Sequence, residues 1–434
     1  FDARGNLYHI RLSSAEEYCI PLPLRRMGVW LPRLAVAVED KRFFSHPGVD
    51  PLALCRALAQ NLNAGRTVSG ASTITSQLVR IAIPRQRTLA TKALEFVQAL
   101  GLEWSLDKDR ILELYLNRAP LGGPYRGVEA AARGYFGKRA EDLTLAEAAA
   151  LVAMFQGPTF YRPDRNPAAL LERRDRILRQ AGQDRWISEE ELRLALQEPV
   201  PAFQASLPLL HWHFAGHSLT RAGKDHWEQG GAPLKTSLDP QVQDLLVRNL
   251  ELGLAGMPED VTAAGAVVDN ASGALLAYVG NARFDPASGR NWVDCGNAPR
   301  SPGSTLKPLI YLEAVEQGLL VPGSLLADTP LSFAGQAPRN FDRAYRGPVS
   351  AAQALSESLN APAVRVLRLV EGESALHRIR AFGFRHFAGN AAHYGDSLAL
   401  GGCEVTLLEL AQAYSDLARL GLRPLGGGEG LHGQ

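Results

Sequence analysis

Apolar residues in the first half of the chain recur mostly at the spacing of an α-helix. From Leu31 to about Leu178 this pattern fills the segments "LATKALEFVQALGLEW", "DKDRILELYLN" and "TLAEAAALVAMF", and Pro and Gly separate the runs. Thr144 stands three residues before Glu147, which is the spacing of a helix capping box. The pattern therefore predicts a first domain that is predominantly α.

The pattern changes after Trp186. A polar stretch ending in prolines predicts a linker, and "AAGAVVDNASGALLAYVGN" contains two short apolar runs separated by residues 269–273, which is typical of a β-hairpin. Helical spacing follows at 305–317, 351–369 and 407–418. We therefore expect a lead-in over 1–30, a mainly α domain over 31–183, a linker over 184–231, and an α/β domain over 232–434.

Length and composition agree with this division. A chain of 434 residues is too long for one ordinary core, and its 46% hydrophobic and 21% charged residues exclude a disordered or collagen-like protein. The net charge of +1 provides no global field for nucleic acid, so no nucleic-acid partner is expected. The cysteines form no C-x-x-C pair and therefore indicate neither a zinc site nor a redox motif: Cys19, Cys55, Cys295 and Cys403.

Basic residues cluster at two places. The first cluster contains Arg80, Arg85, Arg87 and Lys92, and the second runs over 162–176. Such runs are often solvated helix faces, whereas an anionic lipid or a pyrophosphate is the alternative partner.

Two acidic residues end an apolar helical run in "AVEDKRFFSHPGVDP". Glu39 and Asp40 there serve as a cap, as surface charges or as catalytic acids. The following segment, "GRTVSGASTITSQLVR", places hydroxyl residues in a loop before a helix. Ser72 and Thr73 in this loop would either bind phosphate or sugar oxygens or cap the helix.

In this order, the segments resemble the family 51 peptidoglycan glycosyltransferases, the polymerase domain of class A penicillin-binding proteins. The resemblance spans about 31–163. The family's E-D-x-x-F-x-x-H-x-G block is matched by Glu39, Phe43, His46 and Gly48. Its G-x-S-T-I-T-Q-Q-L block is matched by Gly70, Ser72, Thr73, Thr75 and Gln77, with Ser76 at a usual glutamine position.

Two further blocks extend the resemblance. Lys92 and Glu95 match R-K-x-x-E, but Thr91 replaces the arginine, and nearby Arg85 and Arg87 are the candidates to compensate. The K-x-x-I-L-E-x-Y-L-N block is matched from Lys108 to Asn117, and "YFGK" follows at 135–138.

The resemblance implies a lysozyme-like fold and a polymerase reaction. Glu39 is then the general base and Glu95 the second acid, while the growing glycan on its lipid carrier is the donor and lipid II the acceptor. The substrate-binding residues that the resemblance implies are Phe43, His46, Gly70, Ser72, Thr73, Gln77, Lys92, Lys108 and Asn117. A lytic glycosidase is the nearest mechanistic rival. The sequence leaves open whether a divalent cation, Mg²⁺ or Mn²⁺, assists, and no other cofactor is expected.

The second half carries a Ser-x-x-Lys motif in "RSPGSTLKPLIY". Lys307 lies one helical turn after Ser304, so its amine can activate that hydroxyl, and Ser358-x-Asn360 follows 54 residues later (358 − 304 = 54). These motifs resemble the penicillin-binding transpeptidases, which have a β-lactamase-like α/β fold. The resemblance implies that a stem peptide or a β-lactam acylates Ser304, with Lys307, Ser358 and Asn360 handling protons and orientation.

The family's third block, K-T-G on an edge strand, has no match after Lys307, because no later lysine exists. We therefore expect a C-terminally incomplete domain with impaired transpeptidation. An unpaired sheet edge would favour partial disorder, so we expect a protease-resistant core that ends near Ala232.

Two signals are interpreted structurally. His211, His213 and His217 lack a complementary acid or cysteine, so packing is favoured over zinc binding, and no metal site is expected. Phe43 and Phe44 are expected to divide between core packing and contact with a bilayer.

The resemblance also implies a location and partners. It places the protein on the periplasmic side of the bacterial inner membrane, held by an anchor outside this chain, with other cell-wall synthases as partners. A non-catalytic penicillin-binding or scaffold protein is the alternative, which the replacement by Thr91 and the missing K-T-G block favour.

Overall fold

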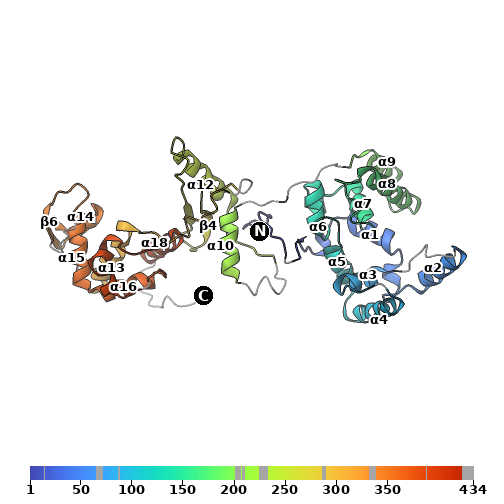
Figure 1. Ribbon diagram of the computed structural model, residues 1–434, viewed down its shortest axis with the longest axis horizontal. Coiled ribbons are helices and arrows are strands. Elements are labelled where there is room, and N and C mark those ends of the chain that lie inside the picture. The colour runs from blue at the N-terminus through green and yellow to red at the C-terminus, as the bar shows by residue number, and fades with distance from the viewer. Residues whose placement is uncertain are drawn as a thin grey trace. The chain divides into compact units, whose positions relative to one another are not determined.

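The chain forms two compact units in a computed structural model (Figure 1). One comprises His9–Leu209, and the other comprises Phe1–Tyr8 with Leu210–Gln434. The structure describes residues 1–13, 15–64, 72–86, 88–200, 207, 211–223, 233–285, 290–331, 339–387 and 389–422. Within these ranges, no helix combines the length and apolarity needed to cross a membrane.

The unit His9–Leu209 is mainly α, as predicted. Its helices are α1 (Trp30–Glu39), α2 (Pro51–Ala64), α3 (Ile74–Ala82), α4 (Leu89–Ser105), α5 (Lys108–Arg118), α6 (Val128–Ala131), α7 (Leu145–Met154), α8 (Pro167–Gln183) and α9 (Glu189–Gln197). Short 3₁₀ or π turns occupy Leu24–Arg26, Phe43–Ser45, Ala132–Phe136 and Ala140–Asp142. The strands β1 (Tyr18–Cys19) and β2 (Tyr125–Arg126) form a short parallel pair.

Helix α7 is the centre of this unit. All its residues are buried, and it packs against α1 and α8. The Thr144 side chain accepts from the Glu147 backbone amide, and the Glu147 carboxylate accepts from the Thr144 amide, so the predicted capping box is confirmed. Helix α1 therefore has a rigid support on which its last residue, Glu39, is held.

Helix α9 lies within the predicted linker 184–231 but packs on α7 and α8. The fully buried Arg174 of α8 joins the two helices, because its guanidinium donates to the backbone carbonyls of Leu196 and Glu198 at the end of α9. This member of the second basic cluster therefore has a structural partner. Residues 201–206, 208–210 and 224–232 of the predicted linker lie outside the described residues.

The other unit combines helices with two small antiparallel sheets. Its helices are α10 (Trp212–Ala222), α12 (Pro240–Gly253), α13 (Lys307–Glu316), α14 (Ala351–Ser356), α15 (Asn360–Val370), α16 (Gly372–Ala381), α17 (Ala391–Tyr394) and α18 (Leu407–Leu422), with 3₁₀ turns at Gly303–Leu306 and Gly395–Leu400. Its strands are β3 (Gly265–Val268), β4 (Leu275–Val279), β5 (Leu325–Asp328) and β6 (Gly347–Ser350). The predicted mixture of α and β structure is confirmed.

The strands β3 and β4 confirm the predicted hairpin, because Gly265 pairs with Val279 and Ala266 with Tyr278. The single helix predicted over 351–369 is wrong. It is divided into α14 and α15 because Ser358 adopts a left-handed conformation with φ of 55°, and Leu359 is extended. The division exposes the Ser358 and Leu359 carbonyls to a buried side chain of α13.

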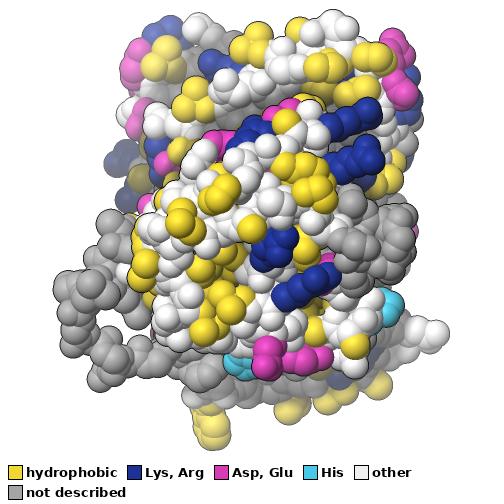
Figure 2. All heavy atoms as spheres, turned by 90° about the vertical axis from the view of Figure 1, so that its left-hand side faces the viewer, with side chains coloured by type: hydrophobic (Ala, Val, Ile, Leu, Met, Phe, Trp, Pro, Cys, Tyr) yellow, Lys and Arg dark blue, Asp and Glu magenta, His cyan; other side chains and the backbone are white. Residues whose placement is uncertain are grey.

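The core of this unit lies between α13, α15 and α16, where Leu309, Val366 and Leu376 are buried. On the side of the molecule that carries α14 and α15, Figure 2 shows hydrophobic side chains in small patches beside lysines and arginines. The mixture agrees with the small net charge.

Candidate active sites

Glu39 is the last residue of α1, and its carboxylate is held at one oxygen. Gln77 of α3 donates from Nε2 to Glu39 Oε2 at 2.9 Å, and Tyr115 of α5 donates to Gln77 Oε1 at 3.2 Å. Glu39 Oε1 is buried and has no hydrogen-bond partner among the described residues. Burial, opposed by Gln77, Gln156 and Arg173, raises the pKa of Glu39 above that of an ordinary carboxyl group.

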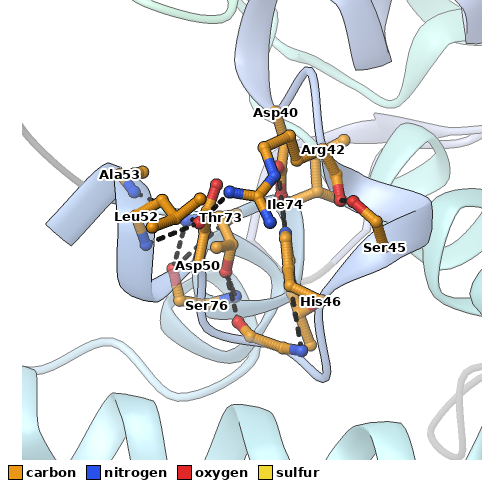
Figure 3. Close-up of polar contacts among 12 residues, drawn as sticks. Asp40, Arg42, Ser45, His46, Asp50, Leu52, Ala53, Thr73, Ile74 and Ser76 are labelled. Carbon is orange, nitrogen blue, oxygen red and sulfur yellow. Dashed lines mark hydrogen bonds and ion pairs between the residues drawn. The ribbon is translucent and has the colours of Figure 1, made fainter. Parts of the chain in front are cut away.

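Asp40, the C-cap of α1, holds the end of this helix through its own hydrogen bonds. His46 Nδ1 accepts from the Gly48 amide, so a neutral ring carries its proton on Nε2 and donates it to Asp40 at 3.0 Å. Asp40 also accepts from the amide of Ile74, the first residue of α3. Figure 3 shows this network, which joins the ends of two helices and thereby positions the neighbouring Glu39.

The helix α3 begins where the sequence predicted a hydroxyl-rich loop to end. Thr73 is the N-cap: its hydroxyl accepts from Ser76 N, and Ser76 Oγ accepts from Thr73 N, which forms a capping box. The Thr73 hydroxyl also donates to the Gly48 carbonyl at 2.6 Å. Ser72 is half-buried immediately before this cap. Gly70 lies outside the described residues.

Gly48 is required by close packing. Its φ is 97°, and a Cβ atom at this position would lie 2.8 Å from the Ala99 carbonyl oxygen on α4. The glycine of the first motif therefore lets the loop after α1 approach α4.

Lys108 stabilises the loop after α1, which contains Phe43 and His46. Lys108 donates to Glu103 at 2.7 Å and to the His46 carbonyl at 2.7 Å, and its ammonium lies 4.3 Å from the centre of the Phe43 ring. Phe43 is fully buried, so it packs in the core, whereas Phe44 is 60% exposed, and its contact with a bilayer stays a prediction.

Asn117 holds the chain before α1. Its side-chain amide accepts from the backbone amide of Leu22 and donates to the Leu22 carbonyl, each at 2.8 Å. The amide oxygen and the amide nitrogen of Asn117 therefore both have a hydrogen-bond partner within the fold.

The second predicted acid lies on α4. Lys92, Glu95 and Gln98 follow one another at intervals of three residues and therefore share one helix face. Arg85 donates to Gln98 at 2.7 Å, which places a guanidinium on this face, while Thr91 is occupied by a hydrogen bond to Thr88, the N-cap. Arg85 thus places a cation beside Gln98, about two turns along α4 from Thr91, and its compensation for the motif arginine stays a prediction. Arg87 lies outside the described residues.

No hydrogen bond or ion pair within the described part of the chain links Glu95 or Lys92 to the cluster around Glu39. The structure brings Glu39 and Gln77 together directly. It places Glu95 and Lys92 together on a separate helix, α4, which packs against α3.

Motif reasoning did not assign two groups beside Glu39. Gln156 follows α7, and Arg173 is on α8; their side chains bond to each other. Arg173 Nε is buried and lacks a partner among the described residues. The second basic cluster was the sequence signal for Arg173, whereas Gln156 had no such signal.

The second site is built around Lys307, the first residue of α13. Its ammonium donates to Ser358 O at 2.6 Å, Asn360 Oδ1 at 2.8 Å and Ser358 Oγ at 3.1 Å. Burial lowers the pKa of Lys307 to about 8. The predicted convergence of Lys307, Ser358 and Asn360 is therefore present in the geometry.

Ser304 lies in the exposed 3₁₀ turn that leads into α13. Within the described residues, no hydrogen bond joins its hydroxyl to Lys307. Asn360 is fixed independently, because its backbone amide donates to Asn340 and its side-chain amide donates to the Arg339 carbonyl.

The three histidines near α10 make separate ring contacts: His211 with Tyr8, His213 with Phe284, and His217 with Tyr278. Throughout the described ranges, no group of three or more His, Cys, Asp or Glu side chains could hold a metal ion.

Comparisons with known proteins match a different family to each half of the chain. Residues 7–182 match the family model described as transglycosylase, and residues 263–423 match that of the penicillin binding protein transpeptidase domain. Penicillin-binding protein 1C of Escherichia coli (strain K12) is 37% identical over 384 residues, which cover 88% of this chain and 49% of that protein. Penicillin-binding protein 1F of Bacillus subtilis (strain 168) is 33% identical over 423 residues, covering 92% and 57%.

Among solved structures, penicillin-binding protein 1A from Haemophilus influenzae matches with a TM-score of 0.45 and 20% identity, covering 96% of this chain and 67% of that chain. The chain spans about half the length of the curated relatives described above.

Proposed function

Because the chain belongs to the class A penicillin-binding proteins, we propose that its helical unit is a peptidoglycan glycosyltransferase that extends glycan strands from lipid II. The observation that carries the proposal is the buried Oε1 of Glu39, which has no hydrogen-bond partner in the part of the chain that the structure describes. A buried carboxylate oxygen without a donor is costly unless a ligand supplies one, and a sugar hydroxyl is such a donor.

In the proposed reaction, the acceptor hydroxyl donates its proton to Glu39 Oε1 while its oxygen forms a bond to the donor sugar. The bond from that sugar to the lipid diphosphate breaks, with inversion at the sugar. Glu39 must be ionised to accept the proton, so its raised pKa brings its proton affinity closer to that required of a base near neutral pH.

The departing diphosphate requires positive charge or a proton. Lys92 and Arg85 on the face of α4 provide cations, and Glu95 between Lys92 and Gln98 is the proposed second acid. Arg173 is a further cation beside Glu39. Whether Mg²⁺ or Mn²⁺ also assists is a separate proposal to be tested by adding each ion or a chelator to the assay.

A lipid-linked substrate requires an apolar surface, and α4 supplies one. Leu94, Val97, Leu100 and Trp104 are exposed on this helix, with Trp104 at 95%. A groove of about 420 Å³ lined by Leu78, Leu102 and Leu114 lies between α3, α4 and α5. We propose that this surface contacts the bilayer on the periplasmic side of the inner membrane.

We propose that the second unit forms an acyl-enzyme with a stem peptide or a β-lactam. Lys307, as the neutral amine, would take the proton of Ser304 while the serine oxygen attacks the carbonyl carbon; the amide bond then breaks, and the leaving nitrogen receives a proton. A pKa of about 8 makes the neutral amine accessible near neutral pH. Association with other cell-wall synthases remains part of the proposal.

The deciding experiment incubates the purified chain with labelled lipid II in detergent and measures glycan length on a gel. We expect long strands from the parent and none from Glu39→Gln, because the amide cannot accept the hydroxyl proton. Shortening of preformed strands would identify a lytic enzyme instead. Failure of the folded parent to form polymer would support the scaffold alternative, for which the replacement of the motif arginine by Thr91 is a specific argument.

A further inference from the structure

We propose that Tyr115 is a positioning residue of the glycosyltransferase site, where its hydroxyl fixes the orientation of Gln77 and thereby leaves Glu39 Oε1 as the oxygen that accepts the proton. The inference rests on the proposed function of Glu39. It assigns a role to the tyrosine of the K-x-x-I-L-E-x-Y-L-N block, which bonds to Gln77 and not to Glu39 itself.

The geometry is a chain of two hydrogen bonds across three helices. Tyr115 of α5 is 1% exposed, and its ring packs edge-on against Phe155 at a centroid distance of 5.5 Å. Its hydroxyl lies 3.2 Å from Gln77 Oε1 on α3, and Gln77 Nε2 lies 2.9 Å from Glu39 Oε2 at the end of α1. The ring packing restricts where the hydroxyl can be.

The direction of these bonds follows from the chemistry of the groups. An ionised carboxylate only accepts, so the part of Gln77 that faces Glu39 must be its NH₂ group. The amide carbonyl then faces Tyr115, whose phenol donates to it. A rotated Gln77 would turn its carbonyl toward the carboxylate, which opposes two acceptors and loses the bond to Glu39, while its NH₂ group would donate to the phenol oxygen instead of its carbonyl accepting from the phenol.

This orientation distinguishes the two oxygens of Glu39. Oε2 receives the amide hydrogen, whereas Oε1 is buried, finds no donor among the residues that the structure describes, and is therefore available to the acceptor hydroxyl. The charged and titratable groups that face the site are Asp40 beyond α1, Arg173 on α8 and Tyr115 itself, and Arg80 of α3 faces Tyr115. Burial and the charge of Asp40 raise the pKa of Glu39. Without the Gln77 bond, mainly Arg173 and Gln156 would oppose this rise.

The test compares the full chain with Tyr115→Phe, which removes the hydroxyl and keeps the ring. The rate of lipid II polymerisation is measured from about pH 5 to about pH 9. We expect the acid limb of the profile to move up by about one pH unit, which lowers the rate on that limb about tenfold. The KM for lipid II should stay unchanged, because Tyr115 acts on the base and not on binding.

Two matched variants distinguish the positioning of Gln77 by Tyr115 from the general effect of removing a buried hydroxyl group. Tyr135 is also fully buried in the helical unit, but its hydroxyl donates only to the backbone carbonyls of Leu121 and Gly122. Tyr135→Phe should leave the pH profile in place. Gln77→Leu should move the limb as Tyr115→Phe does, and adding Tyr115→Phe to Gln77→Leu should cause no further movement.

A measurement that needs no catalytic turnover distinguishes failure of the positioning role of Tyr115 from failure of the proposed polymerase. The carboxyl carbon of Glu39 is followed by NMR in protein with ¹³C-labelled glutamate and assigned by its loss in Glu39→Gln. Its midpoint should rise in Tyr115→Phe and stay in Tyr135→Phe. An unmoved midpoint overturns the role of Tyr115 even if the parent polymerises lipid II, whereas a moved midpoint in a chain that makes no polymer supports the positioning and rejects the polymerase.

Discussion

At the scale of single residues, the proposed role of Lys307 predicts that acylation of Ser304 depends on pH. The serine needs a neutral amine, and the lowered pKa of Lys307, about 8, means that the neutral fraction rises about tenfold for each pH unit below this value. We expect the rate of acylation by a fluorescent penicillin to rise with this slope and to level off above about pH 8. Lys307→Arg, which stays charged, should be inactive, and a flat profile in the parent would exclude Lys307 as the base.

The lowered pKa also has a consequence for stability. Between about pH 8 and pH 10.5, the unfolded chain binds more protons at this lysine than the folded chain does, so stability rises with pH across this window. Below about pH 8 both states are protonated, and the destabilisation is fully present. Near neutral pH, the burial of Lys307 therefore destabilises the fold.

Sequence motifs located the residues of both sites better than they described their contacts. Thr73, Lys108 and Asn117 match motif positions, and the structure adds that their side chains cap α3, neutralise Glu103 and hold Leu22. Their substrate contacts stay predictions. Tyr115 stands at the tyrosine position of the K-x-x-I-L-E-x-Y-L-N block, but the motif gave it no role, and Gln156 lies outside the motifs. Both roles depend on tertiary packing, of α5 on α3 and of α7 on α1.

At the scale of elements, α4 combines a charged face with an exposed apolar one. Val97 and Trp104 lie seven residues apart, or about two turns, so they project from one side of the helix. We expect the parent to sediment with vesicles of anionic and zwitterionic phospholipid, and Val97→Ser with Trp104→Ser to weaken binding about tenfold or more.

The matched control for α4 is Leu252→Ser, which removes an apolar side chain that is 73% exposed on α12 of the other unit. This variant should bind vesicles as the parent does. Equal losses in the two variants would mean that general surface hydrophobicity, and not α4, carries the membrane contact.

Elements with a strong local signal were predictable. The helices α5 and α7 follow from apolar spacing and capping residues, and the β3–β4 hairpin follows from two apolar runs around a turn. The break between α14 and α15 was not predictable from spacing, because the apolar pattern continues through it. The left-handed Ser358 there brings carbonyls to Lys307, so tertiary hydrogen bonds determine the local backbone.

At the scale of the whole molecule, the two units have separate cores, but the chain does not divide between them at a single point. Residues before Tyr8 pair with the segment that precedes α12: Thr236 N donates to Phe1 O, and Ala3 N donates to Leu238 O. Tyr8 itself packs with Phe214 and Tyr278. Eight residues are too few to show a periodicity, so sequence patterns alone gave this segment no assignment beyond a lead-in.

This arrangement predicts that Tyr8, although it precedes the helical unit in sequence, stabilises the other one. Tyr8→Ala removes a buried aromatic ring, which costs about 3 kcal/mol, or roughly 6 to 12 °C for a unit of this size. We expect the temperature at which penicillin binding is lost to fall by this amount, while the temperature at which lipid II polymerisation is lost stays unchanged. Leu151→Ala in the core of α7 should do the reverse. If Tyr8→Ala lowered both temperatures equally, the units would unfold as one cooperative structure, and the activities would have to be treated as coupled through stability.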